Sequence, residues 1–451
     1  MSASSASARP RPGTEVEVTV DTLAYGGNGV ARLEGYVLFV AGAIPGDRVR
    51  AVVTRSKRSY GEARTLEVLS ASPERVAPQA DHPGAPWQVL PYERQLEVKA
   101  EQVDDALRRI GRLEGYALEP IVPAVQQWRY RNKLEYSFGT SDDGGLVCGF
   151  HVPGRYDAVA PMTDCMLASE RNNAAREQVL AWCRERGLDA WDRRSHQGIL
   201  RNLIVREGRR TGQLQVRLVT SPADIGAEEL VGRVDCEGLF LTQTADLGES
   251  TAGGTTTHLA GAPKLEDRIG DLTFRISPEA FFQTNTEMAE ALYGTAVEYA
   301  QLRGHERVFD LFCGIGTIGL TMAARAREVA GVEIVEAAVA DAIENARVNE
   351  VTNARFAAGD IRLAMRELVE RAGRPDVLVV DPPRAGLSQK VVRRLIEAGP
   401  ERIVYVSCNP TTLAPNAAQL VEAGYRLSRV RPVDLFPQTP HIECVALLER
   451  A

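Results

Sequence analysis

Cysteine is scarce and scattered in this chain. Its 451 residues hold seven cysteines, an odd number, and no two of them form a CxxC pair. Disulfide frameworks need paired cysteines, and structural zinc sites need them at close spacing. The sequence therefore argues against a disulfide scaffold, predicts no metal site, and leaves each thiol to be considered on its own.

Long apolar runs are missing too. No stretch of 18 apolar residues exists, so the sequence predicts no transmembrane helix. Residues 1–13, MSASSASARPRPG, have no apolar core that could serve as a secretory signal, and they predict a disordered tail. We therefore expect a cytoplasmic protein with no membrane association, and a monomer.

A net positive charge, which is common in nucleic-acid-binding proteins, is also absent. The formal net charge is −7, so the total gives no indication of a nucleic-acid partner. The distribution says more, because residues 48–64 hold six basic side chains and only one acidic side chain, that of Glu62. This local basic patch either contacts a nucleic acid or is the solvated face of a strand. Its basic members are Arg48, Arg50, Arg55, Lys57, Arg58 and Arg64.

The first part of the chain predicts a small antiparallel β-barrel over residues 14–72. Short β-rich segments alternate there with the turn signals Gly-Gly-Asn-Gly and Pro-Gly-Asp. Small barrels of this kind often bind RNA. A proline-rich connector follows, and YERQLEVKAEQVDDALRRIG (92–111) predicts a helix.

Residues 73–277 contain this connector, this helix and a domain that we expect to be mostly β. Within it, WRYRNK (128–133) places cationic and aromatic side chains in alternation. Such a composition suits stacking on bases and pairing with phosphates, although an amphipathic strand edge gives the same pattern.

Strands and helices alternate over residues 278–451. The first helix is expected over SPEAFFQTNTEMAEALYGTAVEYA (277–300), with Ser277 as its cap and Pro278 in its first turn. The expected strands are RVFDLF, EVAGVEI, FAAGD, VLVVD and RIVYVSC. This alternation is typical of a doubly wound parallel sheet, so the fold class is α/β.

A glycine-rich loop, DLFCGIGTIGL (310–320), follows the first of these strands. Its three glycines, beginning with Gly314, fit GxGxxG and permit a dinucleotide. Asp310 at the strand end would repel a pyrophosphate but would attract the α-amino group of S-adenosylmethionine. Glu333, which ends the next strand, can accept hydrogen bonds from the ribose of either cofactor. Asp360, after the third strand, either meets an adenine amino group or caps the following helix.

Two further predicted strands end in candidate functional residues at the same edge of the sheet. Asp381 and the two prolines after it predict a rigid ledge above the cofactor crevice. Arg384 stands where amino-methyltransferases have an aromatic residue, which disfavours methylation of an exocyclic nitrogen. Cys408 lies at the tip of the fifth strand, and a thiol there favours a nucleophile over the inert buried cysteine that is usual inside strands.

A methyl donor beside a thiol suits methylation of a pyrimidine carbon. C5 of uracil is a poor nucleophile, and addition of a thiolate to C6 activates it, after which a base must remove the C5 proton. Glu443, at the start of the final strand, is the candidate base, and a solvated edge-strand carboxylate is the alternative. Three alternative functions are considered: cytosine-C5 methylation, a nicotinamide oxidoreductase, and a non-catalytic RNA-binding assembly factor. Cytosine-C5 methyltransferases usually carry their nucleophile in a Pro-Cys dipeptide, which this chain lacks.

The motifs together resemble the S-adenosylmethionine-dependent RNA uracil-C5 methyltransferases, which make 5-methyluridine in 23S ribosomal RNA and in transfer RNA. The resemblance rests on FFQTN, DLFCGIGTIGL, GVE, DPPRAGL, VYVSCNPTTLA and FPQTPHIE, within residues 280–445. Residues 14–72 resemble a TRAM domain, and residues 73–277 resemble the central RNA-binding region of the family. This implies a Rossmann-like class I methyltransferase domain over residues 278–451, S-adenosylmethionine as cofactor, and an RNA substrate whose uridine is extruded. 23S ribosomal RNA is the favoured target and transfer RNA the alternative.

The resemblance also assigns roles to residues. Cys408 is the implied nucleophile and Glu443 the implied base. With Asp310 and Gly314 of the loop, the expected cofactor set is Gln283, Phe312, Thr317, Glu333, Asp360 and Asp381. Many members have asparagine at the position of Thr317.

One feature of many TRAM-bearing members is missing. They carry a CxxxxxCGGC cluster between barrel and helix, whereas this chain reads APQADHPGAPWQVLPYERQL and retains only Cys165 at the fourth position. One thiol cannot hold an iron–sulfur cluster, so none is predicted. We expect packing by Trp87 and Tyr92 to replace it.

Overall fold

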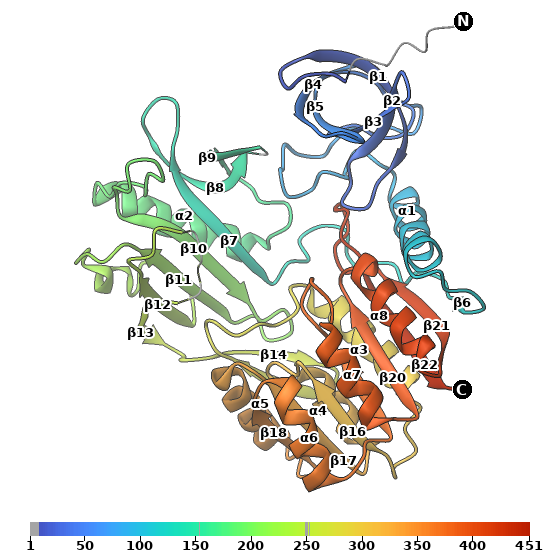
Figure 1. Ribbon diagram of the computed structural model, residues 1–451. Coiled ribbons are helices and arrows are strands. Elements are labelled where there is room, and N and C mark those ends of the chain that lie inside the picture. Colours follow the sequence, from blue (N-terminus) through green and yellow to red (C-terminus); the bar gives the residue numbers. More distant parts are fainter. Residues whose placement is uncertain (1–8, 153, 249–250, 252) are drawn as a thin grey trace, which may run out of the picture. The chain divides into compact units, whose positions relative to one another are not determined.

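The computed structural model describes residues 9–152, 154–248, 251 and 253–451 (Figure 1). Most of the expected N-terminal tail lies outside these residues. The chain divides into two compact units: residues up to Ala106 together with Phe436–Ile442 form the first, and Leu107–Leu435 with Glu443–Ala451 form the second.

The first unit begins with the expected barrel, a closed sheet in the order β1-β2-β3-β5-β4. Its neighbours are antiparallel as predicted except β3 and β5, which are parallel. Its strands are β1 (Glu15–Leu23), β2 (Gly29–Leu33), β3 (Tyr36–Ala41), β4 (Arg48–Ser56) and β5 (Tyr60–Ser70). Alternating side chains such as Val18, Val20 and Leu38 fill its interior, because the period of a strand is two residues. A positive φ of 89° at Gly26 and 92° at Gly27 forms the turn between β1 and β2.

The expected helix follows as α1 (Tyr92–Asp105) and continues into a π-helical turn, η1 (Ala106–Ile110). In the cysteine-free connector before it, Trp87 is 2% exposed and packs with Ile44, Leu90 and Val98. Tyr92 is only partly buried. The predicted packing role therefore falls on Trp87.

A seven-stranded sheet forms the middle of the second unit, in the order β13-β12-β11-β10-β7-β8-β9. All neighbours are antiparallel except β11 and β12. The strands are β7 (Lys133–Thr140), β8 (Leu146–Val152), β9 (Arg155–Pro161), β10 (Leu200–Glu207), β11 (Leu214–Thr220), β12 (Gly238–Gln243) and β13 (Thr255–Gly261). Helix α2 (Glu170–Glu185) packs on β8 and β10, a short 3₁₀ turn η2 (Ala227–Leu230) follows β11, and the hairpin of β14 (Leu265–Ile269) and β15 (Leu272–Ile276) ends the region.

The rest of the second unit is the doubly wound sheet, in the order β18-β17-β16-β19-β20-β22-β21-β6. Five of its strands are parallel: β16 (Arg307–Leu311), β17 (Glu328–Glu333), β18 (Ala354–Ala358), β19 (Val377–Val380) and β20 (Arg402–Ser407). The others are β21 (Tyr425–Val433), β22 (Glu443–Arg450) and β6 (Ala117–Leu118). The expected α/β fold class is confirmed.

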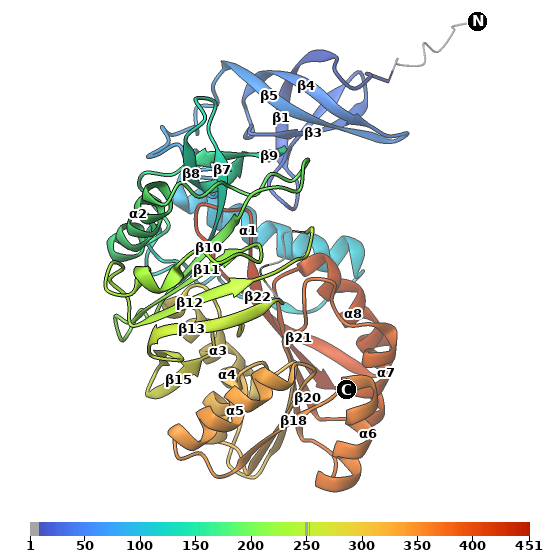
Figure 2. The ribbon, with the colours of Figure 1, turned by 90° about the vertical axis from the view of Figure 1, so that its left-hand side faces the viewer.

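Helices cover both faces of this sheet (Figure 2). One face carries α3 (Thr286–Ala300), α4 (Thr317–Ala323) and α5 (Glu336–Val348), and the other carries α6 (Ile361–Ala372), α7 (Gln389–Ala398) and α8 (Pro410–Glu422). Both faces of the sheet are therefore buried, which explains why a strand such as β19 (VLVV) is apolar throughout.

Helix α3 begins later than the sequence predicts. Its N-cap is Asn285, whose side chain accepts a hydrogen bond from the Met288 amide, so residues 277–285 are not helical. The hydroxyl of Ser277 instead donates to Asp341 at 2.8 Å. The prediction was wrong because a serine followed by proline mimics a cap, whereas here tertiary contacts hold the segment in an irregular form.

Candidate functional site

The candidate catalytic and cofactor-binding side chains lie along one edge of the doubly wound sheet. Its parallel strands all end at this edge, and the strand order reverses direction between β16 and β19, the point at which such sheets bind ligands. β22 runs antiparallel to β20, so its first residue, Glu443, lies at the same edge. Ser407 pairs with Cys444, and the register continued by one residue places Cys408 opposite Glu443.

The loop after β16 leaves space beside its backbone. Phe312 has φ 65°, a left-handed conformation that is uncommon outside glycine, and its amide donates to the carbonyl of Val332. A Cβ added at Gly314 would meet no atom within 4 Å, whereas one at Gly316 would lie 3.0 Å from the ring of Phe356. The loop therefore presents bare backbone on the side of Gly314, where a ligand can approach it closely.

Glu333 fastens this loop to the end of β17. Its carboxylate accepts hydrogen bonds from the amides of Gly314 (3.2 Å), Ile334 (2.8 Å) and Val335 (3.0 Å). The side chain is only partly buried, so it is accessible to a ligand. Its contact with a ribose stays a prediction.

Asp310 lies deeper than the sequence suggests. It has no exposed surface, its Oδ2 accepts the Gly319 amide at 2.8 Å, and its Oδ1 has no hydrogen-bond partner among the described residues. Burial raises the pKa of Asp310 to about 7, and the charges of Asp381 and Glu333 add to the shift. Asp310 thus links the end of β16 to α4. Its burial disfavours the ammonium contact that the sequence predicts, and that contact stays a prediction.

Asp360 adopts the capping role. It is the N-cap of α6 and accepts the Arg362 amide at 2.9 Å, and the Arg362 guanidinium binds both carboxylate oxygens. This pairing lowers the pKa of Asp360 to about 2. The alternative adenine contact stays a prediction.

Gln283 and Thr317 are both buried next to α3. Asn132 donates through its side-chain amide to the Gln283 carbonyl at 2.8 Å and so fixes the irregular segment before the helix. The hydroxyl of Thr317 donates to the Tyr293 hydroxyl at 3.3 Å. Tyr293 was missed by the sequence analysis, because in α3 it reads as one more apolar position.

Tyr293 is buried, and carboxyl groups at this edge act on its hydroxyl electrostatically. Its pKa is raised, first by burial and then by the charges of Asp381, Glu443 and Asp310. A neutral phenol among three carboxyl groups can donate a hydrogen bond to one that ionises. Tyr293 is therefore an additional candidate for the site.

Cys408 lies between β20 and α8 and is partly exposed. The pKa of its thiol is raised to about 11, mainly by burial and further by the charges of Glu443 and Asp381, while Arg384 acts in the opposite direction. Asn409, the N-cap of α8, donates through its side-chain amide to the Arg384 carbonyl at 3.0 Å, which ties the thiol to the ledge after β19. The free protein therefore holds Cys408 as a thiol at neutral pH.

Glu443 is 3% exposed, and its Oε2 has no hydrogen-bond partner among the described residues. Burial and the charge of Asp381 raise its pKa well above the usual range, and Arg384 partly offsets this. Burial also raises the pKa of Asp381 to about 7. A buried carboxyl with an unused oxygen is the state expected of a general base that awaits a substrate.

Two predicted RNA-contact features look different in the structure. In the basic patch, Arg48 pairs with Glu17 and Arg50 with Glu67, both at 2.7 Å, so neighbouring strands compensate part of its charge. Within the basic patch, three exposed side chains have no acidic partner among the described residues: Lys57, Arg58 and Arg64.

The stacking role expected of WRYRNK is wrong for its tyrosine. Tyr130 has no exposed surface, so it cannot stack on a base. Arg129 forms a bidentate pair with Asp164, at 2.8 and 3.1 Å. Arg129 and Tyr130 therefore contribute to packing within their own unit.

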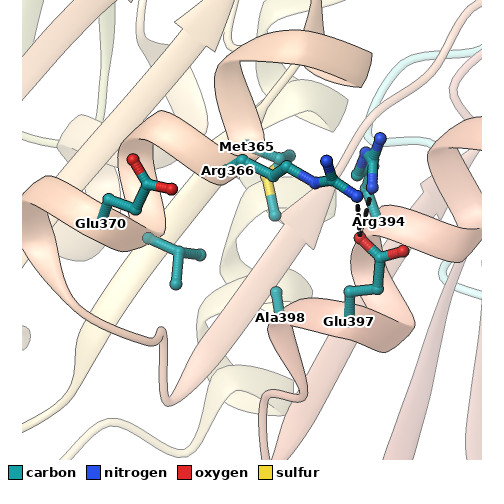
Figure 3. A pocket seen from close by; sticks show the side chains of 7 residues that line it. Met365, Arg366, Glu370, Arg394, Glu397 and Ala398 are labelled. Carbon is teal, nitrogen blue, oxygen red and sulfur yellow. Dashed lines mark hydrogen bonds and ion pairs between the residues drawn. The ribbon is translucent and has the colours of Figure 1, made fainter.

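A depression of about 270 Å³ lies between α6 and α7 (Figure 3). Arg366 and Arg394 both pair there with Glu397. The depression includes none of the strand-end residues, and its charges are largely compensated. Among the described residues, no helix could cross a membrane, and no group of His, Cys, Asp and Glu side chains could hold a metal ion.

Known proteins resemble the chain over nearly its whole length. A profile of the tRNA (Uracil-5-)-methyltransferase family matches residues 262–451, and one of the TRAM domain matches residues 9–66. An uncharacterized RNA methyltransferase of Halalkalibacterium halodurans is 39% identical and is covered over 96% of each chain. Another, of Gloeobacter violaceus, is 39% identical over 97% of each chain. The crystal structure of Pyrococcus abyssi tRNA (uracil-54, C5)-methyltransferase in complex with S-adenosyl-L-homocysteine has a TM-score of 0.80, 27% identity and coverage of 96% of this chain and 99% of that one.

Fold, site and comparisons define a class I S-adenosylmethionine-dependent methyltransferase that acts on RNA and carries a TRAM domain. The chain belongs to the RNA uracil-5 methyltransferase family. The resemblance stated from the motifs is thereby confirmed.

Proposed function

We propose that this enzyme transfers a methyl group to C5 of a uridine in 23S ribosomal RNA, with Cys408 as the nucleophile and Glu443 as the base. The observation that carries this proposal is the pairing of β20 with β22, whose register brings the thiol opposite a buried carboxyl. A transfer RNA is the second candidate substrate, supported by the Pyrococcus abyssi enzyme, which acts on uracil-54 of tRNA.

The residues around the glycine loop fit S-adenosylmethionine. The open space beside Gly314 admits a ligand next to bare backbone, and the Glu333 carboxylate stands at the adjoining strand end. Gln283, Phe312 and Thr317 complete the proposed contacts. When bound, the cofactor supplies a methyl group on a sulfonium that a carbon nucleophile can take.

The proposed chemistry on the base starts at sulfur. The Cys408 thiol gives its proton to a water molecule, and the thiolate then forms a bond to C6 of uracil. The C5=C6 electron pair moves to C5, which takes the methyl group. The Glu443 carboxylate removes the C5 proton, the C5=C6 bond forms again, and the C6–S bond breaks to release the thiolate. The raised pKa of Glu443 makes it a stronger base for this step than an exposed carboxylate.

Two variants test the assignment with 5-fluorouridine RNA, in which fluorine replaces the C5 proton and the adduct cannot resolve. Cys408→Ala should abolish both methylation and the covalent adduct. Glu443→Gln should still form the adduct, and should accumulate a methylated adduct on ordinary uridine RNA as well. A fully active Cys408→Ala enzyme would refute the mechanism.

The target is tested by mapping. 5-Methyluridine in ribosomal and transfer RNA from a deletion strain should be missing at one position of 23S ribosomal RNA. Loss from transfer RNA alone would select the second candidate. Loss of 5-methylcytidine instead would refute uracil methylation.

A further inference from the structure

The proposed base is attached to a short segment that folds with the first unit. Residues Phe436–Ile442 (FPQTPHI), which we call the strap, belong to that unit, whereas Leu435 before it and Glu443 after it belong to the second. One peptide bond thus joins the strap to Glu443. Contacts that fix the strap therefore also constrain the backbone of Glu443, the proposed base.

The centre of the strap is held by an amide pair. The Gln95 side chain of α1 donates to Gln438 Oε1 at 2.8 Å, and the Gln438 backbone amide donates back to Gln95 Oε1 at 2.9 Å. The Trp87 amide donates to the Gln438 carbonyl at 2.9 Å. Both glutamines are buried, at 0% and 4% exposed, and Gln438 has a left-handed φ of 67°. A strained conformation of this kind persists only where its surroundings enforce it.

A buried cation holds the start of the strap. Lys99 of α1 has no exposed surface, and its Nζ donates to the Phe436 carbonyl at 3.0 Å. The Thr439 hydroxyl donates to the same carbonyl at 2.8 Å and accepts the His441 amide at 3.2 Å, so the strap is also tied to itself. Desolvating an ammonium is costly, and the hydrogen bond to the Phe436 carbonyl offsets part of that cost.

The barrel contacts the strap as well. A Cβ added at Gly27, in the turn between β1 and β2, would lie 2.8 Å from Pro440 Cβ, 2.9 Å from Pro440 Cγ and 3.0 Å from Trp87 Nε1. The neighbouring Gly26 has nearly the same φ, 89° against 92°, but a Cβ there would meet no atom within 4 Å. The two glycines therefore form a matched pair that differs in contact with the strap and with Trp87, whose amide also holds the strap.

We propose that Gln95 and Lys99 are positioning residues for Glu443, and that through the strap the N-terminal unit controls the removal of the C5 proton. This inference rests on the proposed function, because it assigns a consequence to the base. In the proposed addition of Cys408 to C6, Glu443 transfers no proton and forms no bond. A displaced strap should therefore slow release of the methylated RNA and still allow the adduct to form.

The first test compares Gly27→Ala with Gly26→Ala in the full-length enzyme. With uridine RNA and S-adenosylmethionine, Gly27→Ala should turn over about ten-fold more slowly than Gly26→Ala, because a displacement near 1 Å can cost up to a hundred-fold. It should also accumulate the methylated covalent adduct, seen as a shifted band on a denaturing gel. Trapping of 5-fluorouridine RNA should be equal in both variants. Equal turnover of the two, without an adduct on uridine RNA, would overturn the inference.

The second test uses the amide pair and does not depend on glycine. Gln438→Met removes the acceptor of the Gln95 side chain, whereas Gln438→Glu retains an acceptor at that position. We expect the methylated adduct to accumulate with Gln438→Met and normal release to return with Gln438→Glu. If both variants release RNA at the wild-type rate, the strap does not position the base. If the wild-type enzyme itself fails to trap 5-fluorouridine RNA, the proposed function fails, and this outcome is distinct from failure of the inference.

Discussion

Replacing Asp310 by asparagine should make the folded protein less sensitive to alkaline pH. The carboxyl has no exposed surface, and only one of its oxygens has a hydrogen-bond partner among the described residues. Burial raises its pKa from 3.8 to about 7. The folded state therefore keeps a proton over a pH range in which the unfolded chain has already lost it.

The sign and size of the effect follow from linkage. A group whose pKa is raised on folding stabilises the protein at low pH, and this contribution is lost as the pH rises through the folded pKa. A shift of about 3 pH units corresponds to about 4 kcal/mol lost between pH 4 and pH 7. About two of these units lie above pH 5, so wild-type stability should fall relative to Asp310→Asn by roughly 2 to 3 kcal/mol between pH 5 and pH 8. Asparagine retains an oxygen that can accept the Gly319 amide.

The assay is urea unfolding of both proteins at pH 5, 6, 7 and 8, followed by circular dichroism. Asp360→Asn is the control. The pKa of Asp360 is lowered, so its contribution to stability is lost only as the pH falls below the unfolded pKa of 3.8. The difference in unfolding free energy between this variant and wild type should therefore be constant from pH 5 to pH 8. If the free energies of wild type and Asp310→Asn run parallel from pH 5 to pH 8, the carboxyl ionises without penalty and the reasoning is refuted.

The same variant decides the role that the sequence suggested for Asp310. Contact with the cofactor ammonium would make Asp310→Asn bind S-adenosylmethionine about ten-fold or more weakly, since a hydrogen bond to a charged group contributes about 1.5–3 kcal/mol. Because the carboxyl is fully buried beneath the loop, we expect a much smaller change by calorimetry.

Three other predictions follow from single features. Gly331→Ala should lower the free energy of unfolding in urea by about 1–3 kcal/mol, because the new methyl would overlap the ring of Phe356. Gly294→Ala is the control and should not destabilise the protein, because its methyl would meet no atom within 4 Å. Equal effects of the two substitutions would contradict the packing. Lys57→Ala combined with Arg58→Ala should weaken RNA binding and lower the salt dependence by about one ion per charge removed, as measured by filter binding; an unchanged slope would exclude this turn from the RNA contact. Alkylation of Cys408 in the free enzyme, followed by mass spectrometry, should rise about ten-fold per pH unit from pH 7 to 9, because its pKa is about 11; a plateau below pH 9 would show that the thiolate forms more easily.

Local patterns were enough to predict the barrel, the doubly wound sheet and the strand-end positions of the candidate residues. Turn signals between apolar segments mark the barrel, and a glycine loop or an Asp-Pro-Pro ledge after an apolar strand marks the ligand edge. Cys408 follows from the same logic, since the end of a parallel strand in such a sheet faces the crevice. The polar partners of the basic patch did not follow, because they lie on other strands of the barrel.

The sequence by itself determined which strands form and which side chains they carry to the edge of the sheet, because both depend on neighbours a few residues apart. Tertiary structure alone decided that Glu443 is buried opposite the thiol, that Asp310 has no exposed surface, and that Tyr293 is a further candidate for the site. It also decided that α1, far away in the chain, holds the strap before Glu443. Burial, and with it the pKa of a carboxyl, depends on atoms brought together from distant segments, and local sequence patterns do not encode that proximity.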